Sequence, residues 1–345
     1  MILNFEQVQS ATRGANKVVE KDGMFTFSRF NEKQLDYYKE TSPRDFYVKA
    51  SATASVCIDF YTDSKTFAFD YLIEHATGRK YYYFDVYVDG ILVKHLGEYN
   101  AWIKKGSISV NLDAEGHPSW VKTKHKNFRP EKEGEHRVSL WFPNLSNATL
   151  LNISLDDGAS FRKAESMKNI LVFGDSITQG YDAVAPSMSY INRIARHFDA
   201  NVRNLAIGGE KFVPGILDSE LDFIPDFITV AYGTNDWSAR PREEFSAGCD
   251  AFLSGLAGIY PNVPKFMILP LWRGDFRAQK KFEGTFGEAS LYIREKAESL
   301  GFIVFDGWNY LPHIPEFFLD ERLHPNDMGF AEYASGLISD IEQYI

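Results

Sequence analysis

The second half of the chain alternates short apolar runs with longer amphipathic stretches, and this alternation restricts the folds open to it. The apolar runs occupy residues 170–173, 202–205, 227–232, 266–269 and 303–305, and helical patterns cover 243–260, 285–300 and 329–344. Strands that alternate with helices form a parallel sheet with helices on both faces. The pattern therefore predicts a flavodoxin-like, three-layer α/β/α domain over residues 166–345.

The first half has a different pattern. Short alternating segments, rich in β-branched and aromatic residues, occupy 54–61, 66–72, 81–88, 107–112, 136–141 and 150–155. Turn-forming pairs such as Asp89-Gly90 and Asp157-Gly158 lie between them. A length of 345 residues suits two domains. We therefore expect residues 1–165 to form an all-β, jelly-roll-like antiparallel sandwich, joined directly to the second domain.

Composition narrows the classes of partner. Hydrophobic residues make up 44% of the chain and charged residues 24%, as in ordinary globular proteins. A net charge of −10 argues against nucleic acid and anionic membranes as partners. The N-terminus does not resemble a signal peptide, and no run approaches about 18 apolar residues. We expect a cytoplasmic protein, with Cys57 and Cys249 buried rather than paired. A homo-oligomer remains open.

Ser176 follows the first apolar run of the second half, in the stretch Gly174-Asp175-Ser176. A serine at the carboxyl end of a parallel strand is a candidate nucleophile, although the same residue type also caps helices. Polar blocks follow in order at 204–209 (NLAIGG), 233–236 (GTND) and 323–327 (LHPND). The presence of these three blocks, in this order after Ser176, favours the catalytic interpretation.

The four blocks together resemble those of the SGNH hydrolases, the GDSL esterase/lipase superfamily, from about residue 169 to the C-terminus. The resemblance implies the three-layer fold, Ser176 as nucleophile and His324 as its base. It also implies an oxyanion hole made by the backbone amides of Ser176 and Gly209 and by the side chain of Asn235. Gly209 is preferred to Gly208 because the family spacing is Asn-x-x-x-x-Gly. Residues 84–90 further resemble the N-terminal domain of some SGNH carbohydrate esterases.

The acid that orients His324 is left open by the sequence. The family has Asp three residues before its His, but here that position is Glu321, and Asp320 lies one residue earlier. Either carboxylate could serve, or neither, and we favour Asp320 slightly because a loop accommodates one extra residue. Asp175 and Asp236 are expected to be structural.

Neither a metal nor a cofactor is expected, because the histidines are scattered and no His-Glu-x-x-His motif or phosphate-binding loop is present. Several aromatic residues lie beside the blocks and could stack on sugar rings; they are Tyr181, Trp237, Trp272 and Trp308. The sequence therefore predicts an esterase that removes acetyl or other short acyl groups from carbohydrates. The alternatives are a thioesterase or lysophospholipase-like acyl hydrolase, and a sugar-binding protein whose hydrolase domain is vestigial.

Overall fold

The computed structural model describes residues 1–99, 105–112, 134–218, 221 and 224–345. These residues form two compact units. The first, here the sandwich unit, comprises Met1–Arg29, Ser51–Ser166 and Ala185–Ser187. The second, here the α/β unit, comprises Phe30–Ala50, Met167–Val184 and Met188–Ile345. A single boundary at residue 165 would have assigned residues 30–50 to the first unit, whereas the structure assigns them to the second.

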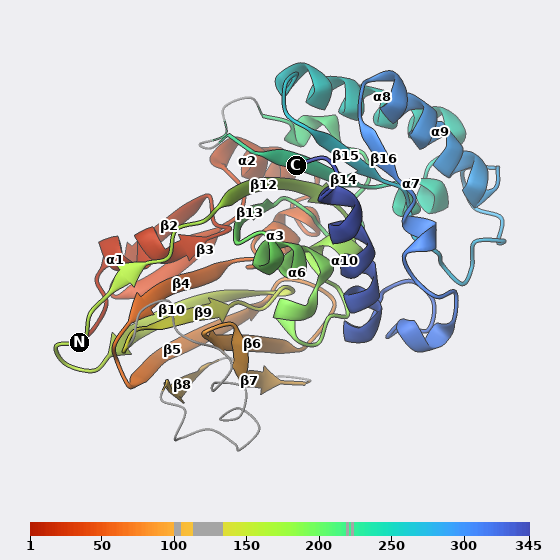
Figure 1. Cartoon of the computed structure of the whole chain (residues 1–345). Coiled ribbons are helices and arrows are strands. Elements are labelled where there is room, and N and C mark those ends of the chain that lie inside the picture. The colour runs from red at the N-terminus through yellow and green to blue at the C-terminus, as the bar shows by residue number, and fades with distance from the viewer. Residues whose placement is uncertain (100–104, 113–133, 219–220, 222–223) are drawn as a thin grey trace. The chain divides into compact units, whose positions relative to one another are not determined.

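The sandwich unit consists of two antiparallel sheets, as the alternating pattern predicted (Figure 1). One sheet has the order β1-β4-β9-β6-β7, with β11 beside β4, and the other has the order β2-β3-β10-β5-β8. The strands are β1 Thr12–Arg13, β2 Lys17–Lys21, β3 Met24–Ser28, β4 Cys57–Thr62, β5 Thr66–His75, β6 Tyr82–Val88, β7 Ile91–Glu98, β8 Lys105–Asn111, β9 His136–Trp141, β10 Ser146–Leu155 and β11 Arg162–Lys163, and helix α1 covers Phe5–Ala11.

Alternate side chains of both sheets form one apolar core in this unit. Phe60 of β4 and Phe67 of β5 belong to different sheets, and their ring centroids lie 5.4 Å apart. Phe69 of β5 meets Phe84 of β6 at 5.5 Å. Large aromatic side chains in edge-to-face contact account for much of the burial that holds two such sheets together.

The α/β unit contains a parallel sheet of order β13-β12-β14-β15-β16, the flavodoxin-like arrangement that was predicted. Figure 1 shows α8 and α9 on one face and α6 and α10 on the other. The strands are β12 Lys168–Gly174, β13 Ala200–Asn204, β14 Phe227–Ala231, β15 Lys265–Ile268 and β16 Ile303–Phe305. The helices are α5 Ser176–Gln179, α6 Tyr190–His197, α7 Thr234–Ala239, α8 Arg242–Ile259, α9 Phe286–Ser299 and α10 Asp327–Ile341.

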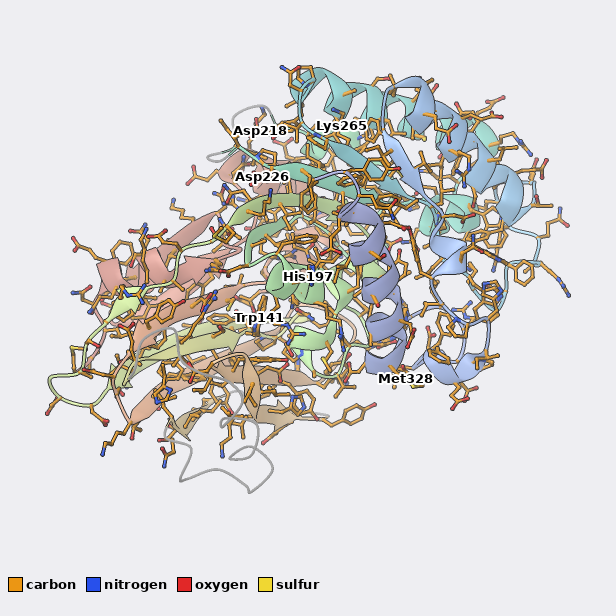
Figure 2. The ribbon with its side chains drawn as sticks, viewed as in Figure 1. Trp141, His197, Asp218, Asp226, Lys265 and Met328 are labelled. Carbon is orange, nitrogen blue, oxygen red and sulfur yellow. The ribbon has the colours of Figure 1, made fainter. Side chains whose placement is uncertain are left out.

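The pairing of β12 with β14 begins at a polar lock between Asn169 and Asp226. The amide of Asn169 donates to Asp226 Oδ2 at 2.6 Å, and the amide of Asp226 donates back to the Asn169 carbonyl at 2.8 Å. Asp226 is labelled in Figure 2. Beyond this point β12 is buried on both faces, as is usual for a strand inside a parallel sheet. These two hydrogen bonds fix the register in which β12 and β14 pair.

Helices α2 (Glu32–Thr41) and α3 (Phe46–Ala50) were not predicted. Asn31 and Gln34 form a capping box at the start of α2. Tyr38, from the middle of α2, is fully buried and donates a hydrogen bond to Glu210. Gln34 donates to the carbonyl of Ile216 at 2.9 Å. These two helices complete the core of the α/β unit from a distant part of the chain.

Among the described residues, no helix is both long enough and apolar enough to cross a membrane.

Candidate active site

Ser176 lies at the carboxyl end of β12, as the first residue of the short helix α5. Asp175 caps that helix, because its Oδ1 accepts a hydrogen bond from the amide of Ile177 at 3.0 Å. Gly174 must be glycine, since a Cβ there would come within 2.2 Å of the Thr178 hydroxyl. The tight turn places Ser176 at the carboxyl edge of the sheet, where 6% of the residue is accessible.

His324 meets Ser176 across 148 positions of sequence, with its Nε2 at 2.8 Å from the serine Oγ. Its other ring nitrogen, Nδ1, lies 2.8 Å from Asp320 Oδ2. An ionised carboxylate only accepts hydrogen bonds, so Nδ1 carries the proton. Nε2 is then the acceptor and faces the hydroxyl, which is the tautomer a general base requires.

Asp320, rather than Glu321, faces the imidazole. Asp320 Oδ1 also accepts from the amides of Leu323 and His324, at 2.7 and 3.0 Å. Burial acts to raise the pKa of Asp320, but the hydrogen bonds from the His324 ring and these amides outweigh it and hold the pKa well below its usual range. Glu321 is exposed and adopts a φ of +58°. The chain turns at Glu321, and the extra residue is absorbed in the loop.

A second carboxylate approaches the same ring nitrogen. Asp182 Oδ2 lies 3.5 Å from His324 Nδ1, and the residue is almost fully buried. Asp182 has a φ of +69° and follows Tyr181, whose ring stacks on His324 with the centroids 5.5 Å apart. Ligand atoms of Asp182, Asp320 and His324 lie within 4.8 Å of one another. Because Nδ1 of His324 carries a proton that it donates to Asp320, this nitrogen is not available as a metal ligand.

Two side-chain hydrogen bonds tie the second block to the nucleophile turn. Asn204 donates to the Thr178 carbonyl at 3.0 Å, and Gln179 Oε1 accepts from the amide of Gly208 at 2.7 Å. Gly209 has a φ of +88°, a region that favours glycine. Gly208 has no room for a side chain, because a Cβ would come within 2.6 Å of the Tyr181 ring.

Asn235 follows β14 as the second residue of α7. Its Nδ2 donates to the Glu210 carbonyl at 3.0 Å and lies 3.4 Å from Asp175 Oδ2. Burial is the main influence on Asp175 and raises its pKa to about 7. Asp236, the next residue, is also buried and accepts from the Phe212 amide at 3.1 Å, which suits a structural role. The third block is thus connected to the first and the second.

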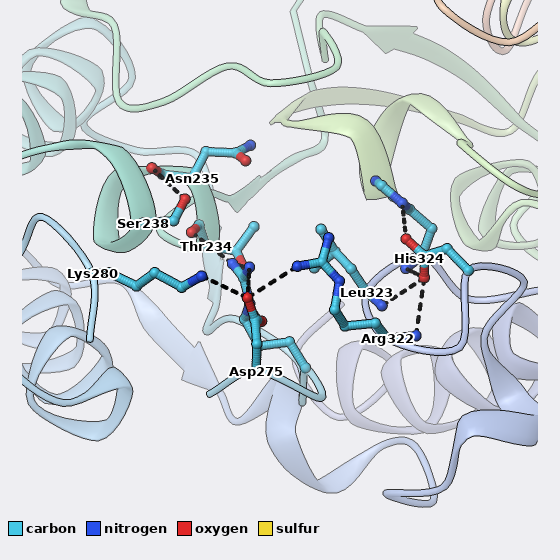
Figure 3. Close-up of polar contacts among 10 residues, drawn as sticks. Thr234, Asn235, Ser238, Asp275, Lys280, Arg322, Leu323 and His324 are labelled. Carbon is cyan, nitrogen blue, oxygen red and sulfur yellow. Dashed lines mark hydrogen bonds and ion pairs between the residues drawn. The ribbon is translucent and has the colours of Figure 1, made fainter. Parts of the chain in front are cut away.

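A charged cluster around Asp275 links the third block to the His324 loop (Figure 3). Asp275 accepts from Arg273 at 2.6 and 3.1 Å, from Lys280 at 2.7 Å and from Arg322 at 3.0 Å. Arg273 is buried and also donates to the Thr234 carbonyl and hydroxyl, next to Asn235. Because Arg322 is two residues from His324, the cluster holds both loops against one carboxylate.

The four aromatic residues expected to bind substrate lie in different environments. Trp237 is fully buried and donates to the Gly284 carbonyl at 3.1 Å, so its ring is not open to a sugar. Tyr181 and Trp272 are largely buried, stacked on His324 and His313 respectively. Trp308 is half-buried and lines a cavity of about 850 Å³ beyond the ends of β15 and β16. Trp308 alone of the four lines this cavity.

The sequence interpretation missed three features of this site: Asp182, the Asp275 cluster, and Lys49, whose Nζ donates to the Gly208 carbonyl at 2.8 Å. Asp182 and Arg273 directly follow noted residues, Tyr181 and Trp272, so closer attention to charged neighbours could have found them. Lys49 has no sequence pattern that points to the site.

A parallel three-layer fold that collects a hydroxyl, an imidazole and amide groups at the carboxyl edge of its sheet is typical of acyl-group hydrolases. The family model of GDSL-like lipases and acylhydrolases matches residues 172–331. Residues 172–331 therefore match a domain of that family, and the protein is a carboxylic ester hydrolase.

Solved structures with the same fold span nearly the whole chain. A salicylyl-acyltransferase from a tetracycline biosynthetic pathway is 21% identical with a TM-score of 0.78, over 96% of this chain and 94% of its own. A putative GDSL-like lipase from Bacteroides ovatus is 19% identical with a TM-score of 0.72, over 97% and 96%. A family two carbohydrate esterase from Cellvibrio japonicus is 17% identical with a TM-score of 0.57, over 98% and 96%. No curated protein sequence matches this chain significantly.

Proposed function

We propose that this protein is a serine esterase that removes short acyl groups, chiefly acetyl, from the hydroxyls of carbohydrates. The observation that carries the proposal is the 2.8 Å contact between His324 Nε2 and Ser176 Oγ, with Nδ1 of the same ring bonded to Asp320. Nucleophile, base and orienting acid are thereby in hydrogen-bonding sequence before any substrate binds.

The first half of the reaction acylates Ser176. Its Oγ attacks the ester carbonyl carbon while its proton passes to His324 Nε2. Asp320 stabilises the resulting imidazolium through the Nδ1 hydrogen bond. The tetrahedral intermediate then expels the sugar oxygen, which takes the proton from Nε2, and an acyl-serine remains.

The second half returns the enzyme to its starting state. A water molecule attacks the acyl-serine carbonyl as His324 Nε2 takes one of its protons. Collapse of the second intermediate breaks the bond to Ser176, whose Oγ regains that proton, and the short carboxylic acid leaves. The proton passes only between Ser176, His324, the sugar oxygen and water. The reaction therefore consumes only the ester and water.

The amides of Ser176 and Gly209 and the Nδ2 of Asn235 serve as the oxyanion donors in this proposal. Asn235 lies beside Asp175, the neighbour of the nucleophile, and its backbone is held by the bond from Arg273 to Thr234. One Nδ2 hydrogen of Asn235 is bonded to the Glu210 carbonyl, so the other must leave its long 3.4 Å contact with Asp175 Oδ2 to reach the oxyanion. The two backbone donors stabilise the developing charge without such a change.

A carbohydrate substrate is further supported by a cavity that Trp308 lines. Ser176, His324 and Asn235 are not in its wall, so it would hold a part of the substrate away from the reacting ester. Its wall includes Phe276 and Phe286 as well as charged side chains of both signs, such as Arg277 and Glu283. Aromatic faces combined with polar groups suit a neutral ring bearing hydroxyls. Similarity of fold to the carbohydrate esterase from Cellvibrio japonicus is consistent with this choice.

The proposal is tested with a panel of acetylated mono- and oligosaccharides and with the Ser176→Ala variant. Wild-type protein should release acetate from the sugars, and the variant should release none. An organophosphonate probe should label Ser176 covalently, and a chelator should leave the rate unchanged. Near wild-type turnover by Ser176→Ala, or labelling of another residue, would show that the nucleophile is misassigned.

A further inference from the structure

Lys49 reaches the second block from a distant part of the chain. It belongs to α3, 159 positions before Gly208, and its Nζ donates to the Gly208 carbonyl at 2.8 Å. The same Nζ lies 2.7 Å from Asp45 Oδ1 on the preceding turn and 5.3 Å from the Phe46 ring centroid. Only 19% of the side chain is exposed, so the ammonium group is held in one place.

The Gly208 carbonyl and the Gly209 amide belong to the same peptide unit. A cation that donates to the oxygen of a peptide draws electron density from its nitrogen, which makes the N–H at the other end a stronger donor. Lys49 therefore acts on Gly209 without touching a substrate. Its Nζ also lies 3.6 Å from the position that a Cβ of Gly209 would occupy, so the charge lies close to this amide.

The Gly208–Gly209 peptide also needs an external hold on its orientation. Gly209 has a φ of +88°, and glycine passes between positive and negative φ with little steric cost. If this peptide rotated, its carbonyl oxygen would take the place of the Gly209 N–H and could not donate to an oxyanion. On its N-terminal side the Gly208 amide donates to Gln179 Oε1 at 2.7 Å, but that bond fixes the preceding peptide. The bond from Lys49 fixes the carbonyl of the peptide in question.

We infer that Lys49 is a positioning residue for the oxyanion hole, which orients and polarises the Gly208–Gly209 peptide so that the Gly209 amide stabilises the tetrahedral intermediate. The inference rests on the proposed function, in which Gly209 is one of the donors. It assigns a part in catalysis to a residue outside the 172–331 segment that the family model matches.

The test compares Lys49→Met, which keeps the length but loses the donor and its charge, with Lys49→Arg, which retains both. Direct removal of an oxyanion donor costs about 10² to 10³ in kcat. Because Lys49 acts through a peptide, Lys49→Met should lose roughly tenfold in kcat with little change in KM, and Lys49→Arg should recover most of it. Lys39→Met, an exposed lysine on α2, is the matched control and should match wild type.

Two further measurements separate positioning from general damage. The affinity for a short alkylboronic acid, which forms a tetrahedral adduct with the serine, should fall in Lys49→Met by the same factor as kcat/KM, while the melting temperature stays close to that of wild type. A kcat within twofold of wild type, or a loss of kcat that tracks a lower melting temperature without rescue by Lys49→Arg, would overturn the inference. The proposed function fails separately, if Ser176→Ala retains activity.

Discussion

Asp182 Oδ2 lies 3.5 Å from His324 Nδ1, the same nitrogen that Asp320 Oδ2 contacts at 2.8 Å. Two carboxylates therefore face one ring N–H, one in hydrogen-bonding contact and the other slightly beyond it. Asp182 is almost fully buried, whereas Asp320 is partly exposed. Both negative charges favour the imidazolium that forms when Ser176 gives up its proton.

This arrangement predicts that loss of Asp320 is partly compensated. Removing the acid of a triad can cost about 10⁴ in kcat. We expect Asp320→Asn to lose roughly 10² to 10³, because Asp182 still stabilises the imidazolium, and Asp182→Asn with Asp320→Asn to approach the full loss. Glu321→Gln is the control and should stay within about tenfold of wild type. The measurement is kcat for acetyl ester hydrolysis, and equal losses in the single and double variants would rule out a role for Asp182.

Asn235→Ala should keep the fold and lose about 10² to 10³ in kcat, the usual effect of removing one oxyanion donor. Ser238→Ala is a suitable control, since Ser238 only donates to the Asn235 carbonyl at 3.2 Å (Figure 3). Steady-state kinetics and circular dichroism are measured on both variants. A loss below about fivefold for Asn235→Ala would remove this side chain from the oxyanion hole.

Acyl chain length and Trp308 together test the substrate. We expect kcat/KM to be higher for acetyl than for octanoyl esters, whereas an apolar groove for an acyl chain would gain about 0.8 kcal/mol per buried CH₂. Trp308→Ala should raise KM for acetylated oligosaccharides and leave small aryl acetates unaffected, and Trp308→Phe should restore part of the loss. Rates that rise steadily from acetyl to octanoyl would favour a lipase-like substrate.

Asp175 predicts a pH dependence of stability. Burial raises its pKa from 3.8 to about 7, so the folded protein retains a proton there that the unfolded chain releases above its lower pKa. Stability from this group is therefore present at low pH and is lost as pH rises from about 4 to 7, by up to about 1.4 kcal/mol per pH unit.

Asp175→Asn removes this titration and keeps an oxygen that can accept from the Ile177 amide. Chemical denaturation at pH 5 and pH 8 should show a smaller drop in unfolding free energy for the variant than for wild type. Burial also raises the pKa of Asp236, to about 6, and the charge of Asp236 helps to raise the pKa of Asp175. Asp236 titrates in both proteins, so the comparison reports Asp175 together with its coupling to Asp236. Equal drops would mean that Asp175 ionises normally in the folded state.

Tyr38→Phe should lower the unfolding free energy by about 1 to 3 kcal/mol, because it removes a hydrogen-bond donor from a buried carboxylate. Glu210 is fully buried and accepts from both Tyr38 and Tyr232. Tyr47→Phe, on the more exposed part of α3, is the control and should have little effect. A variant as stable as wild type would show that Glu210 finds another donor.

Periodicity was sufficient to predict both architectures. The β12, β14 and β15 runs are continuous and apolar, which is typical of strands covered on both faces, and the sandwich strands alternate. Helix α2 was missed because few of its residues are apolar, although the capping box of Asn31 and Gln34 is a recognisable start.

The site was predictable only where local sequence carries it. Ser176, His324, Gly209 and Asn235 stand in short blocks, and the structure brings the first two into contact. The choice between Asp320 and Glu321 depended on the backbone, since the chain bends at Glu321 with a φ of +58° and it is Asp320 Oδ2 that lies 2.8 Å from the ring. Lys49 depends on a contact between distant segments, which spacing within a motif does not encode.

Residues 30–50 impose an order of assembly on the newly made chain. The hydrogen bond from Tyr38 cannot form until Glu210, 172 positions later, has been synthesised, and the bond from Lys49 likewise requires Gly208. During synthesis the sandwich unit can fold while this segment stays without the core against which it packs. Contacts of such long sequence separation form slowly. A fragment that begins at residue 167 would therefore contain all four blocks and still lack Phe30–Ala50, which supply part of the core of the same unit.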